Sequence, residues 1–350
     1  MTKEAFLSQP IDLVIPWMSG DDPVWRKRYI DSQGGLIDAG RYKDHGELHF
    51  CLWSVSKYMP WIRRVHIITE CSLPAYAESF PDLVVTHPDT LLNDVGVTPN
   101  FNSNVIESRM HMIPGLSEIF LFGCDDYFVG RPIPKEYWFD ERSGLPRSDL
   151  RVAVIPQNGM NANNGVMPSL RNTNRIMRGV YGTDERLGRD EHFTQSHQFG
   201  LLTRTACNIA WERFRSHLMR LCSLPTREPL SQQLTSHLLF QMVGDREGIL
   251  SIWVSGKDSE WELFGASSGR TLDQEWKQGT YYARLRALSI SPPPFFCLNN
   301  IGRPEHYPGN VGLFRRFAGL FARGKPLPPL KVQRPNTNPR SMSMMSGRRR

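Results

Sequence analysis

The chain has 350 residues, of which 40% are hydrophobic and 22% are charged, so it can bury one large core or two smaller ones. This composition excludes a collagen, a small disulfide scaffold and a wholly disordered chain. Residues 303–350 hold eleven Lys or Arg and one acidic residue, a sum of +10, whereas residues 1–302 sum to −3. Only this tail is basic enough to favour nucleic-acid binding. Because the remainder of the chain is nearly neutral, we expect no nucleic-acid partner.

Membrane and secretion signals are weak. No window approaches the roughly 18 apolar residues of a membrane-spanning helix, and the N-terminal segment meets Asp12 before a signal-peptide core can form. The six cysteines are scattered without a CxxC pair, and we expect reduced, buried thiols. The sequence therefore predicts a cytoplasmic protein, which its basic tail would place at the inner face of the membrane.

Short apolar runs that end at polar, Gly or Pro residues predict buried strands. They cover residues 11–16, 65–69, 83–86, 118–122 and 152–155. Between them, residues 47–58 and 103–112 have helical spacing, and Asn102 is a suitable N-cap for the second helix. This alternation predicts an α/β fold over residues 1–157, with a mostly parallel sheet and flanking helices.

The remainder of the chain differs in character. Residues 158–190, rich in Asn, Gly and Arg, are expected to form a loop or lid. Residues 191–310 carry helical apolar stripes over 205–222 and 230–243, which predicts a mainly helical part that packs on the sheet. Residues 311–350 are expected to be a basic, partly disordered tail with one helix over 311–323.

Asp125 and Asp126 are the sharpest local signal. They follow the apolar run 119–122, and the carboxyl ends of strands are where open α/β sheets bind ligands. Paired carboxylates suit a divalent cation, and a nucleotide diphosphate needs one. The alternative is that the pair caps a turn.

Two weaker clusters precede this pair. Asn102 and Ser103, followed by Glu107, would present donors to a phosphate at a helix start, although many N-caps have this composition without a ligand. Trp17 and Gly20 follow the first strand, where Gly20 would let a ligand approach the backbone and Trp17 would stack on a base. An acidic turn beside core tryptophans explains that segment equally well.

Taken together, these segments resemble the Stealth family of hexose-1-phosphate transferases. Residues 11–25 resemble its first block, and the second is matched from Arg41 through Asp125-Asp126 to residues 130–132. The third block is looser, with His197 and an arginine that is Arg227 or Arg215. Residues 297–300 resemble the fourth. The resemblance implies that the sheet of residues 1–157 is a nucleotide-sugar-binding and catalytic core, and that residues 191–310 complete the active site.

The chain departs from the family pattern at five positions, occupied here by Ser19, His49, Trp53, Cys124 and Asn300. His49 and Trp53 replace two arginines, and their loss would weaken the grip on a diphosphate. Three explanations are open. The donor differs from that of the family, the lost charges are replaced by Arg41, Arg63 and Arg109, or the activity has been lost.

The resemblance implies transfer of a sugar-1-phosphate from a UDP-sugar to a glycan hydroxyl, with release of UMP, in capsular or exopolysaccharide biosynthesis. The implied catalytic residues are Asp125, Asp126, His197 and Arg227, with Mg²⁺ or Mn²⁺ on the two aspartates. The base is His197 or one of the carboxylates. The implied substrate-binding residues are Asp12, Trp17, Gly20, Asp22, Arg41, Glu47, Asn102, Ser103, Glu107, Arg109, Asn299 and Asn300.

Two other functions remain open at this point. A metal-dependent glycosyltransferase would use the same kind of donor but release UDP. An inactive sugar-nucleotide-binding module would dock on an anionic membrane surface through its basic tail.

Overall fold

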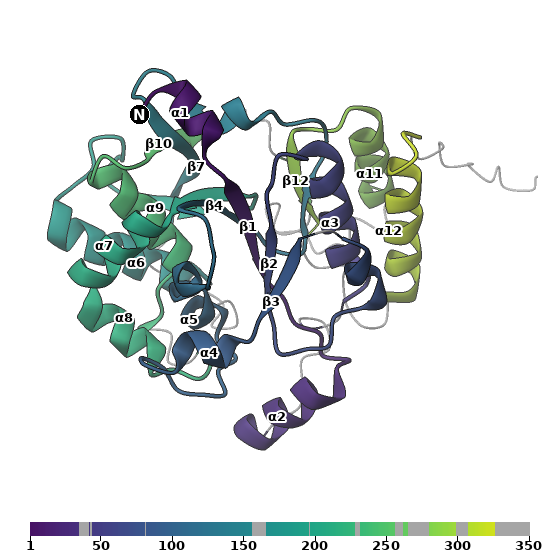
Figure 1. The fold of residues 1–350 in the computed structure, drawn as a ribbon, viewed down its shortest axis with the longest axis horizontal. Coiled ribbons are helices and arrows are strands. Elements are labelled where there is room, and N and C mark those ends of the chain that lie inside the picture. The colour runs from purple at the N-terminus through teal and green to yellow at the C-terminus, as the bar shows by residue number, and fades with distance from the viewer. Residues whose placement is uncertain are drawn as a thin grey trace, which may run out of the picture.

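The computed structural model describes residues 1–34, 42, 44–80, 82–155, 166–195, 197–227, 232–255, 262–264, 280–298 and 307–325. Its centre is a five-stranded sheet in the order β3-β2-β1-β4-β9 (Figure 1). The strands are β1 (Ile11–Pro16), β2 (Val65–Ile68), β3 (Leu83–Thr86), β4 (Ile119–Phe122) and β9 (Gly200–Thr203). The first four are parallel, and β9 is antiparallel to β4. The predicted mostly parallel sheet is confirmed.

The central strands separate two hydrophobic cores, because neighbouring residues of a strand face opposite sides of a sheet. In β4, Ile119 and Leu121 belong to one core, and Phe120 and Phe122 belong to the other. All four side chains are buried. This double burial is why β4 is a continuous apolar run rather than an alternating one.

Helices cover both faces of the sheet (Figure 1). The first part of the chain supplies α1 (Lys3–Ser8), α2 (Pro23–Gln33), α3 (Glu47–Tyr58), α4 (Pro88–Leu92) and α5 (Ser103–Ser108). Helix α3 has the predicted bounds. The helix predicted over residues 103–112 is shorter, because α5 ends at Ser108 and a 3-10 turn, η2 (Met110–Met112), follows it.

The part predicted to be mainly helical contains α7 (Arg204–Arg213), α8 (Arg215–Cys222) and α9 (Ser236–Arg246). The helix predicted over residues 205–222 is interrupted at Phe214, whose backbone leaves the helical region and whose ring is buried. Helices α7 and α9 pack against each other. This part forms the second core on the sheet, together with α5.

The predicted loop over residues 158–190 is wrong for its central part, where α6 (Val166–Tyr181) forms. Its buried face combines Leu170, Ile176 and Met177 with polar side chains such as Thr173 and Asn174. Asn174 exchanges hydrogen bonds of 2.8 and 2.9 Å with the backbone of Phe193. These satisfied polar groups hide the helical stripe in the sequence. Residues 156–165 lie outside the described part.

Two smaller sheets flank the central one. In the first, β7 (Leu145–Val154) pairs with β6 (Phe139–Asp140), β8 (Glu191–Gln195) and β10 (Ser251–Ser255), so the strand predicted at 152–155 is the end of a longer one. In the second, β12 (Phe295–Leu298) joins β5 (Tyr127–Val129) to β11 (Glu262–Phe264). Two further 3-10 turns are η1 (Ala75–Ser79) and η3 (Lys135–Trp138).

The predicted tail is wrong at its start, because α12 (Tyr307–Phe321) belongs to the folded core. It packs beside α11 (Thr280–Ile290), and Figure 1 shows both next to α3. Phe314, Phe317 and Phe321 are buried against the ring of Phe50. Together with Leu313, these rings form a buried apolar face on α12, which packs on the core while the neighbouring arginines stay exposed. Residues 326–350 lie outside the described part.

The helix lengths and the cysteine side chains bear on the predictions about membrane-spanning helices and disulfide bonds. Among the residues that the structure describes, no helix is long and apolar enough to cross a membrane. All six cysteines are free thiols, and all but Cys124 are buried, which confirms the prediction of reduced, buried thiols.

Candidate active site

The candidate site lies at the carboxyl edge of the central sheet, between β1 and β4. After β1 the chain adds β2 and β3 on one side of it, and β4 then pairs with the other side. The loops that leave β1 and β4 therefore run in opposite directions. Open α/β sheets bind ligands in the crevice that such a switch of direction creates.

A cavity of about 260 Å³ opens at this edge. It is lined by Pro16, Ser103, Asn104, Glu107, Phe122, Cys124, Asp125, Asp126, Tyr127, Ser169, Gln195, His197, Arg227, Thr235 and His237. The fold therefore brings the four implied catalytic residues to one cavity, although they are up to about 100 positions apart in the chain. Ser103 and Glu107 of the implied substrate-binding set join them.

The carboxylate pair is positioned by the close packing that ends β4. A Cβ on Gly123 would lie 2.6 Å from Cδ1 of Phe199, so glycine is required where the chain turns out of the sheet. Asp125 and Asp126 follow and remain partly exposed to the cavity. The Leu298 amide donates to the Asp126 carbonyl at 3.2 Å, and the Cys297 thiol donates to Asp126 Oδ2 at 3.4 Å.

Several carboxyl groups are crowded here. Burial and the charges of Asp126 and Asp44 raise the pKa of Asp125, and burial raises the pKa of Asp126. Glu47 is buried at the start of α3 and does not line the cavity, but burial and the charge of Asp125 raise the pKa of Glu47 to about 9. This crowding disfavours the fully ionised cluster unless a cation is present.

The two carboxylates at the cavity suit a Mg²⁺ ion whose other ligands come from a substrate and from water. Among the described residues, no group of three or more His, Cys, Asp or Glu side chains is arranged to hold a metal ion. Mg²⁺, however, commonly takes one or two protein carboxylates and completes its shell with substrate phosphates and water. Asp125 and Asp126 therefore fit a cation that is shared with a bound diphosphate.

Arg227 is held at the cavity by the start of α5. Its Nη2 donates to Ser103 Oγ at 2.5 Å. Asn102, buried and implied to bind substrate, instead accepts from the Asn104 amide as the N-cap and donates to the Thr226 carbonyl at 2.9 Å. Asn102 thus anchors the residue before Arg227 and positions the guanidinium indirectly.

Two histidines line the cavity and differ in their surroundings. Burial, together with the charges of Arg151 and His237, lowers the pKa of His197 to about 4, so its imidazole is neutral at pH 7. His237 Nδ1 lies 2.8 Å from Glu107 Oε2, and its ring stacks on Phe122 with 4.5 Å between ring centroids. A carboxylate at this distance fixes the orientation of the ring.

The structure corrects the predictions for Asp12 and Arg109. Asp12 is fully buried near the amino end of β1, roughly 13 Å of strand rise from Pro16. It accepts hydrogen bonds of 2.8 Å from both Arg63 Nε and the Ser117 amide. Arg109 donates to both carboxylate oxygens of Asp94 at 2.8 Å. Asp12 and Arg109 are buried in these contacts, stabilise the fold and are not available to a substrate, and Arg63 is paired with Asp12.

Residues of the first block build the wall beside β1. Trp17 is buried, the Gly20 amide donates to the Tyr42 carbonyl, and Asp22 caps α2 through the amides of residues 24 and 25. Asp22 also accepts from the Ser72 amide at 2.9 Å. None of the three lines the cavity within the described part, so their predicted contact with substrate stays a prediction.

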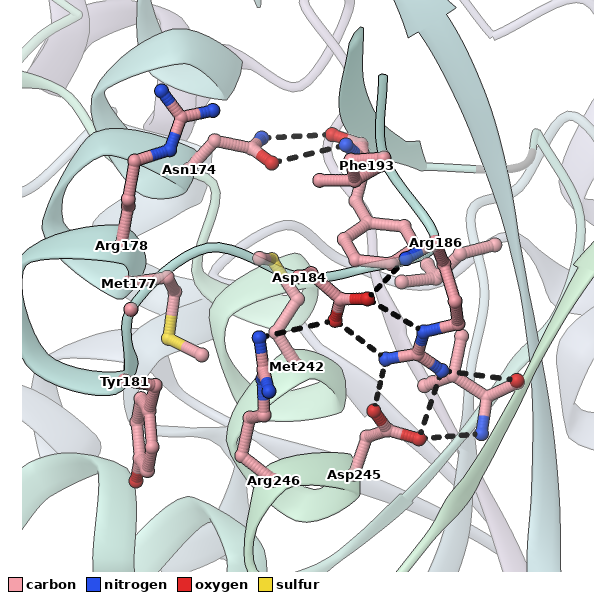
Figure 2. A pocket seen from close by; sticks show the side chains of 14 residues that line it. Asn174, Met177, Arg178, Tyr181, Asp184, Arg186, Phe193, Met242, Asp245 and Arg246 are labelled. Atoms are coloured by element: carbon pink, nitrogen blue, oxygen red, sulfur yellow. Dashed lines mark hydrogen bonds and ion pairs between the residues drawn. The ribbon is translucent and has the colours of Figure 1, made fainter. Parts of the chain in front are cut away.

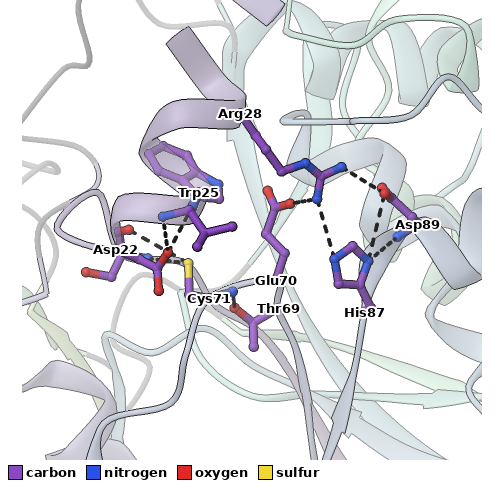
Figure 3. A network of polar contacts seen from close by, with 10 residues as sticks. Asp22, Trp25, Arg28, Thr69, Glu70, Cys71, His87 and Asp89 are labelled. Carbon is purple, nitrogen blue, oxygen red and sulfur yellow. Dashed lines mark hydrogen bonds and ion pairs between the residues drawn. The ribbon is translucent and has the colours of Figure 1, made fainter. Parts of the chain in front are cut away.

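A polar network next to Asp22 fixes α2 over the loops (Figure 3). Arg28 of α2 forms ion pairs with Glu70 and Asp89, which follow β2 and β3. His87 lies beside Arg28 and Asp89 in the same network. The loops that leave the first three strands are therefore tied to one helix.

The remaining predicted residues are placed as follows. Arg41, Asn299 and Asn300 lie outside the described residues. Arg215 is exposed on α8 and does not line the cavity, so Arg227 is the arginine of the third block that the fold brings there.

The two positions where the family pattern has arginine are filled by aromatic contacts. His49 stacks on Tyr76 with 4.4 Å between ring centroids, and Trp53 packs on Phe50 and Phe321. Trp53 therefore faces the core that contains α12.

Sequence reasoning missed several residues of the cavity. They include Tyr127, Ser169, Gln195, Thr235 and His237. His237 stands among apolar residues at the start of α9, where a histidine is indistinguishable from a structural one. Ser169 and Gln195 come from the predicted loop and from β8, and tertiary contacts alone bring them together.

Comparison with known proteins points to one family. Residues 41–146 match the model of Stealth protein CR2, conserved region 2. Exopolysaccharide phosphotransferase SCO6023 of Streptomyces coelicolor is 38% identical over 169 residues, 44% of this chain and 29% of that protein. Exopolysaccharide phosphotransferase CpsY of Mycobacterium tuberculosis is 27% identical over 311 residues, 84% of this chain and 53% of that protein. The chain thus spans about half the length of these relatives or less.

Among solved structures, the galactosyltransferase LgtC in complex with donor and acceptor sugar analogues matches with a TM-score of 0.43 and 9% identity. The match covers 88% of this chain and 95% of that one.

Proposed function

We propose that this chain, a member of the Stealth family through its conserved region 2, transfers a sugar-1-phosphate from a UDP-sugar to a hydroxyl of a glycan acceptor. The product is a phosphodiester between the two sugars, and UMP is released. The observation that carries this proposal is the single cavity at the carboxyl edge of the sheet, which joins a carboxylate pair, Arg227 and two histidines.

The reaction requires attack at the sugar-proximal phosphorus. The acceptor oxygen forms a bond to this phosphorus, the bond from phosphorus to the bridging oxygen of UMP breaks, and the acceptor proton passes to a base. Catalysis of such a step depends mainly on positioning and on neutralising phosphate charge. Arg227 supplies a guanidinium fork that pairs with two phosphate oxygens, and Ser103 holds this fork in place.

Asp125 and Asp126 would hold Mg²⁺ or Mn²⁺ against the diphosphate. A cation there supplies charge neutralisation on the phosphate oxygens and on the departing UMP. The packing at Gly123 positions the segment that carries both carboxylates, and the Cys297 thiol donates to Asp126.

His237 is the base that the contacts favour. Glu107 is within hydrogen-bond distance and would stabilise the charge that His237 gains when it accepts the proton. His197 also lines the cavity, but burial, together with the positive charge of Arg151, lowers its pKa and opposes protonation. We therefore assign His197 to binding the acceptor or donor through its ring nitrogens.

Incubation of the purified chain with a panel of UDP-sugars, Mg²⁺ and glycan primers tests the proposal. We expect UMP, detected by chromatography, to accumulate in proportion to phosphodiester product. Accumulation of UDP would instead indicate a glycosyltransferase. A chain that turns over none of the donors but still binds them would be an inactive sugar-nucleotide-binding module.

A further inference from the structure

The active-site cavity has two sides of different chemistry. Within the described part, its formally charged side chains come from α5, from the loop after β4 and from residue 227, and they are Glu107, Asp125, Asp126 and Arg227. The side built by α6, β8 and the N-cap of α9 adds uncharged polar side chains, namely Ser169, Gln195 and Thr235. These three residues are called the neutral wall below.

The register of β8 places Gln195 on the cavity side of that strand. Gln195 pairs with Leu150 of β7 and stands two residues after Phe193. Leu150 and Phe193 are both buried in the core that contains Phe122, which itself lines the cavity. Alternate residues of a strand share a face, so the side chain of Gln195 lies on this face and that of Thr194 on the other.

Helix α6 holds the neutral wall together. Thr173 Oγ1 accepts a hydrogen bond of 2.9 Å from the Thr235 amide, and Thr235 Oγ1 donates to Ser169 Oγ at 3.1 Å. One residue further along α6, Asn174 exchanges two hydrogen bonds with the backbone of Phe193 (Figure 2). The helix is thus tied both to the start of α9 and to β8, and the wall is built before any substrate binds.

Gln195 differs from the other two residues of the neutral wall. Its side chain is partly exposed at the cavity, and its carboxamide forms no hydrogen bond with another residue that the structure describes. A carboxamide offers an N–H donor and an oxygen acceptor side by side. Two neighbouring hydroxyls of a sugar ring offer the complementary acceptor and donor, whereas a phosphate is better served by the charged side of the cavity.

The position of the base identifies which sugar lies against this wall. His237, which we assign as the base, is two residues after Thr235 and lines the same cavity. The attacking hydroxyl must come within hydrogen-bond reach of the base, so the ring that carries this hydroxyl lies beside Thr235. We propose that the neutral wall binds the acceptor sugar, and that Gln195 selects acceptors by the pattern of their hydroxyl groups. This inference rests on the proposed function.

Binding of simple sugars to the full chain, measured by saturation-transfer NMR, tests the proposal. The probes are the methyl pyranosides of glucose, galactose, mannose and N-acetylglucosamine, followed by monodeoxy analogues of the one that binds best. The variant is Gln195→Ala. The matched control is Thr194→Ala, which removes a polar group from the next residue of β8 on the opposite face. Both side chains are partly exposed, so both variants should keep the wild-type melting temperature.

We expect Gln195→Ala to bind the best pyranoside roughly five- to tenfold more weakly than the wild type, the effect of losing one or two neutral hydrogen bonds. The Thr194→Ala control should match the wild type. Removal of one particular hydroxyl from the sugar should weaken binding to the wild type by a similar factor. It should leave binding to Gln195→Ala unchanged, because that hydroxyl has then already lost its partner.

Three results would overturn the proposal. They are a wild type that binds none of the pyranosides, equal affinity of the wild type and Gln195→Ala, and a kinetic effect on the wrong substrate. In steady-state assays of UMP release, Gln195→Ala should raise KM for the glycan primer and leave KM for the UDP-sugar unchanged. A rise confined to the UDP-sugar would make the wall a donor-sugar site. Absence of UMP release by the wild type is a separate result, which would refute the proposed function without changing the binding comparison.

Discussion

Replacement of Asp125 by Asn should stabilise the chain while it abolishes activity. Burial and two neighbouring carboxylates raise the pKa of Asp125 from 3.8 to about 8. Between these two pH values the side chain is ionised in the unfolded state but protonated in the folded state. A carboxyl group with a raised pKa leaves the free energy of unfolding unchanged at low pH and lowers it as the pH rises through the folded-state pKa. Asn cannot ionise, so the variant avoids this destabilisation while it keeps the size of the side chain.

The size of the stabilisation by Asp125→Asn follows from the pKa shift of Asp125. Four pKa units correspond to roughly 5 kcal/mol at most, and water that reaches these partly exposed carboxyls reduces the gain to about 1–3 kcal/mol at pH 8. For a chain of this size the melting temperature of Asp125→Asn would rise by roughly 3–10 °C in EDTA. The difference from the wild type should shrink towards pH 4, where both forms are uncharged.

Differential scanning fluorimetry at several pH values, with EDTA or Mg²⁺, measures these effects. Mg²⁺ should stabilise the wild type, because a ligand that binds the folded state raises its stability, and it should stabilise the variant much less. Asp31→Asn, an exposed residue of α2, is the matched control and should change neither result. A lower melting temperature of Asp125→Asn in EDTA at pH 8, or equal stabilisation of both proteins by Mg²⁺, would refute the electrostatic reasoning.

Three further predictions concern the cavity and the C-terminal helix. His237→Ala and Glu107→Gln should each lower turnover on the order of 10²-fold with little change in melting temperature, and normal turnover of both would remove this pair from the mechanism. Arg227→Ala should lower turnover at least as much, whereas Arg215→Ala should be silent; the reverse pattern in steady-state kinetics would exchange their roles. Phe317→Ala should cost about 3–5 kcal/mol in the free energy of unfolding measured with urea, and an unchanged unfolding midpoint would show that α12 is not part of the core.

The sequence predicted the central sheet well, because its strands are buried on both faces. A run such as Ile119 to Phe122 has no amphipathic alternative, and the bounds of β1 and β3 were predicted without error. The helix α6 was missed because half of its buried face is polar. Ser169 and Thr173 form hydrogen bonds with Thr235, and Asn174 forms them with the backbone of Phe193. These partners are remote in the sequence, so no local pattern reveals them.

The residues implied to be catalytic were predicted through a resemblance to a family, and the fold brings more of them together than of the residues implied to bind substrate. Asp125, Asp126, His197 and Arg227 converge on one cavity. Asp12 does not join them, because an acidic residue in a β-strand can serve equally well as a buried ion-pair partner. Sequence spacing cannot separate these two roles, since the distinction depends on which end of the sheet the side chain occupies.

The fate of the sugar-proximal phosphate tests the central claim most directly. A UDP-sugar radiolabelled at this phosphorus is incubated with the purified chain, Mg²⁺ and a glycan primer, and the products are separated by size and charge. Phosphotransfer predicts that the label moves to the glycan and that unlabelled UMP is released in equal amount. Label that remains in a UDP product, while the primer gains only sugar, would contradict the account.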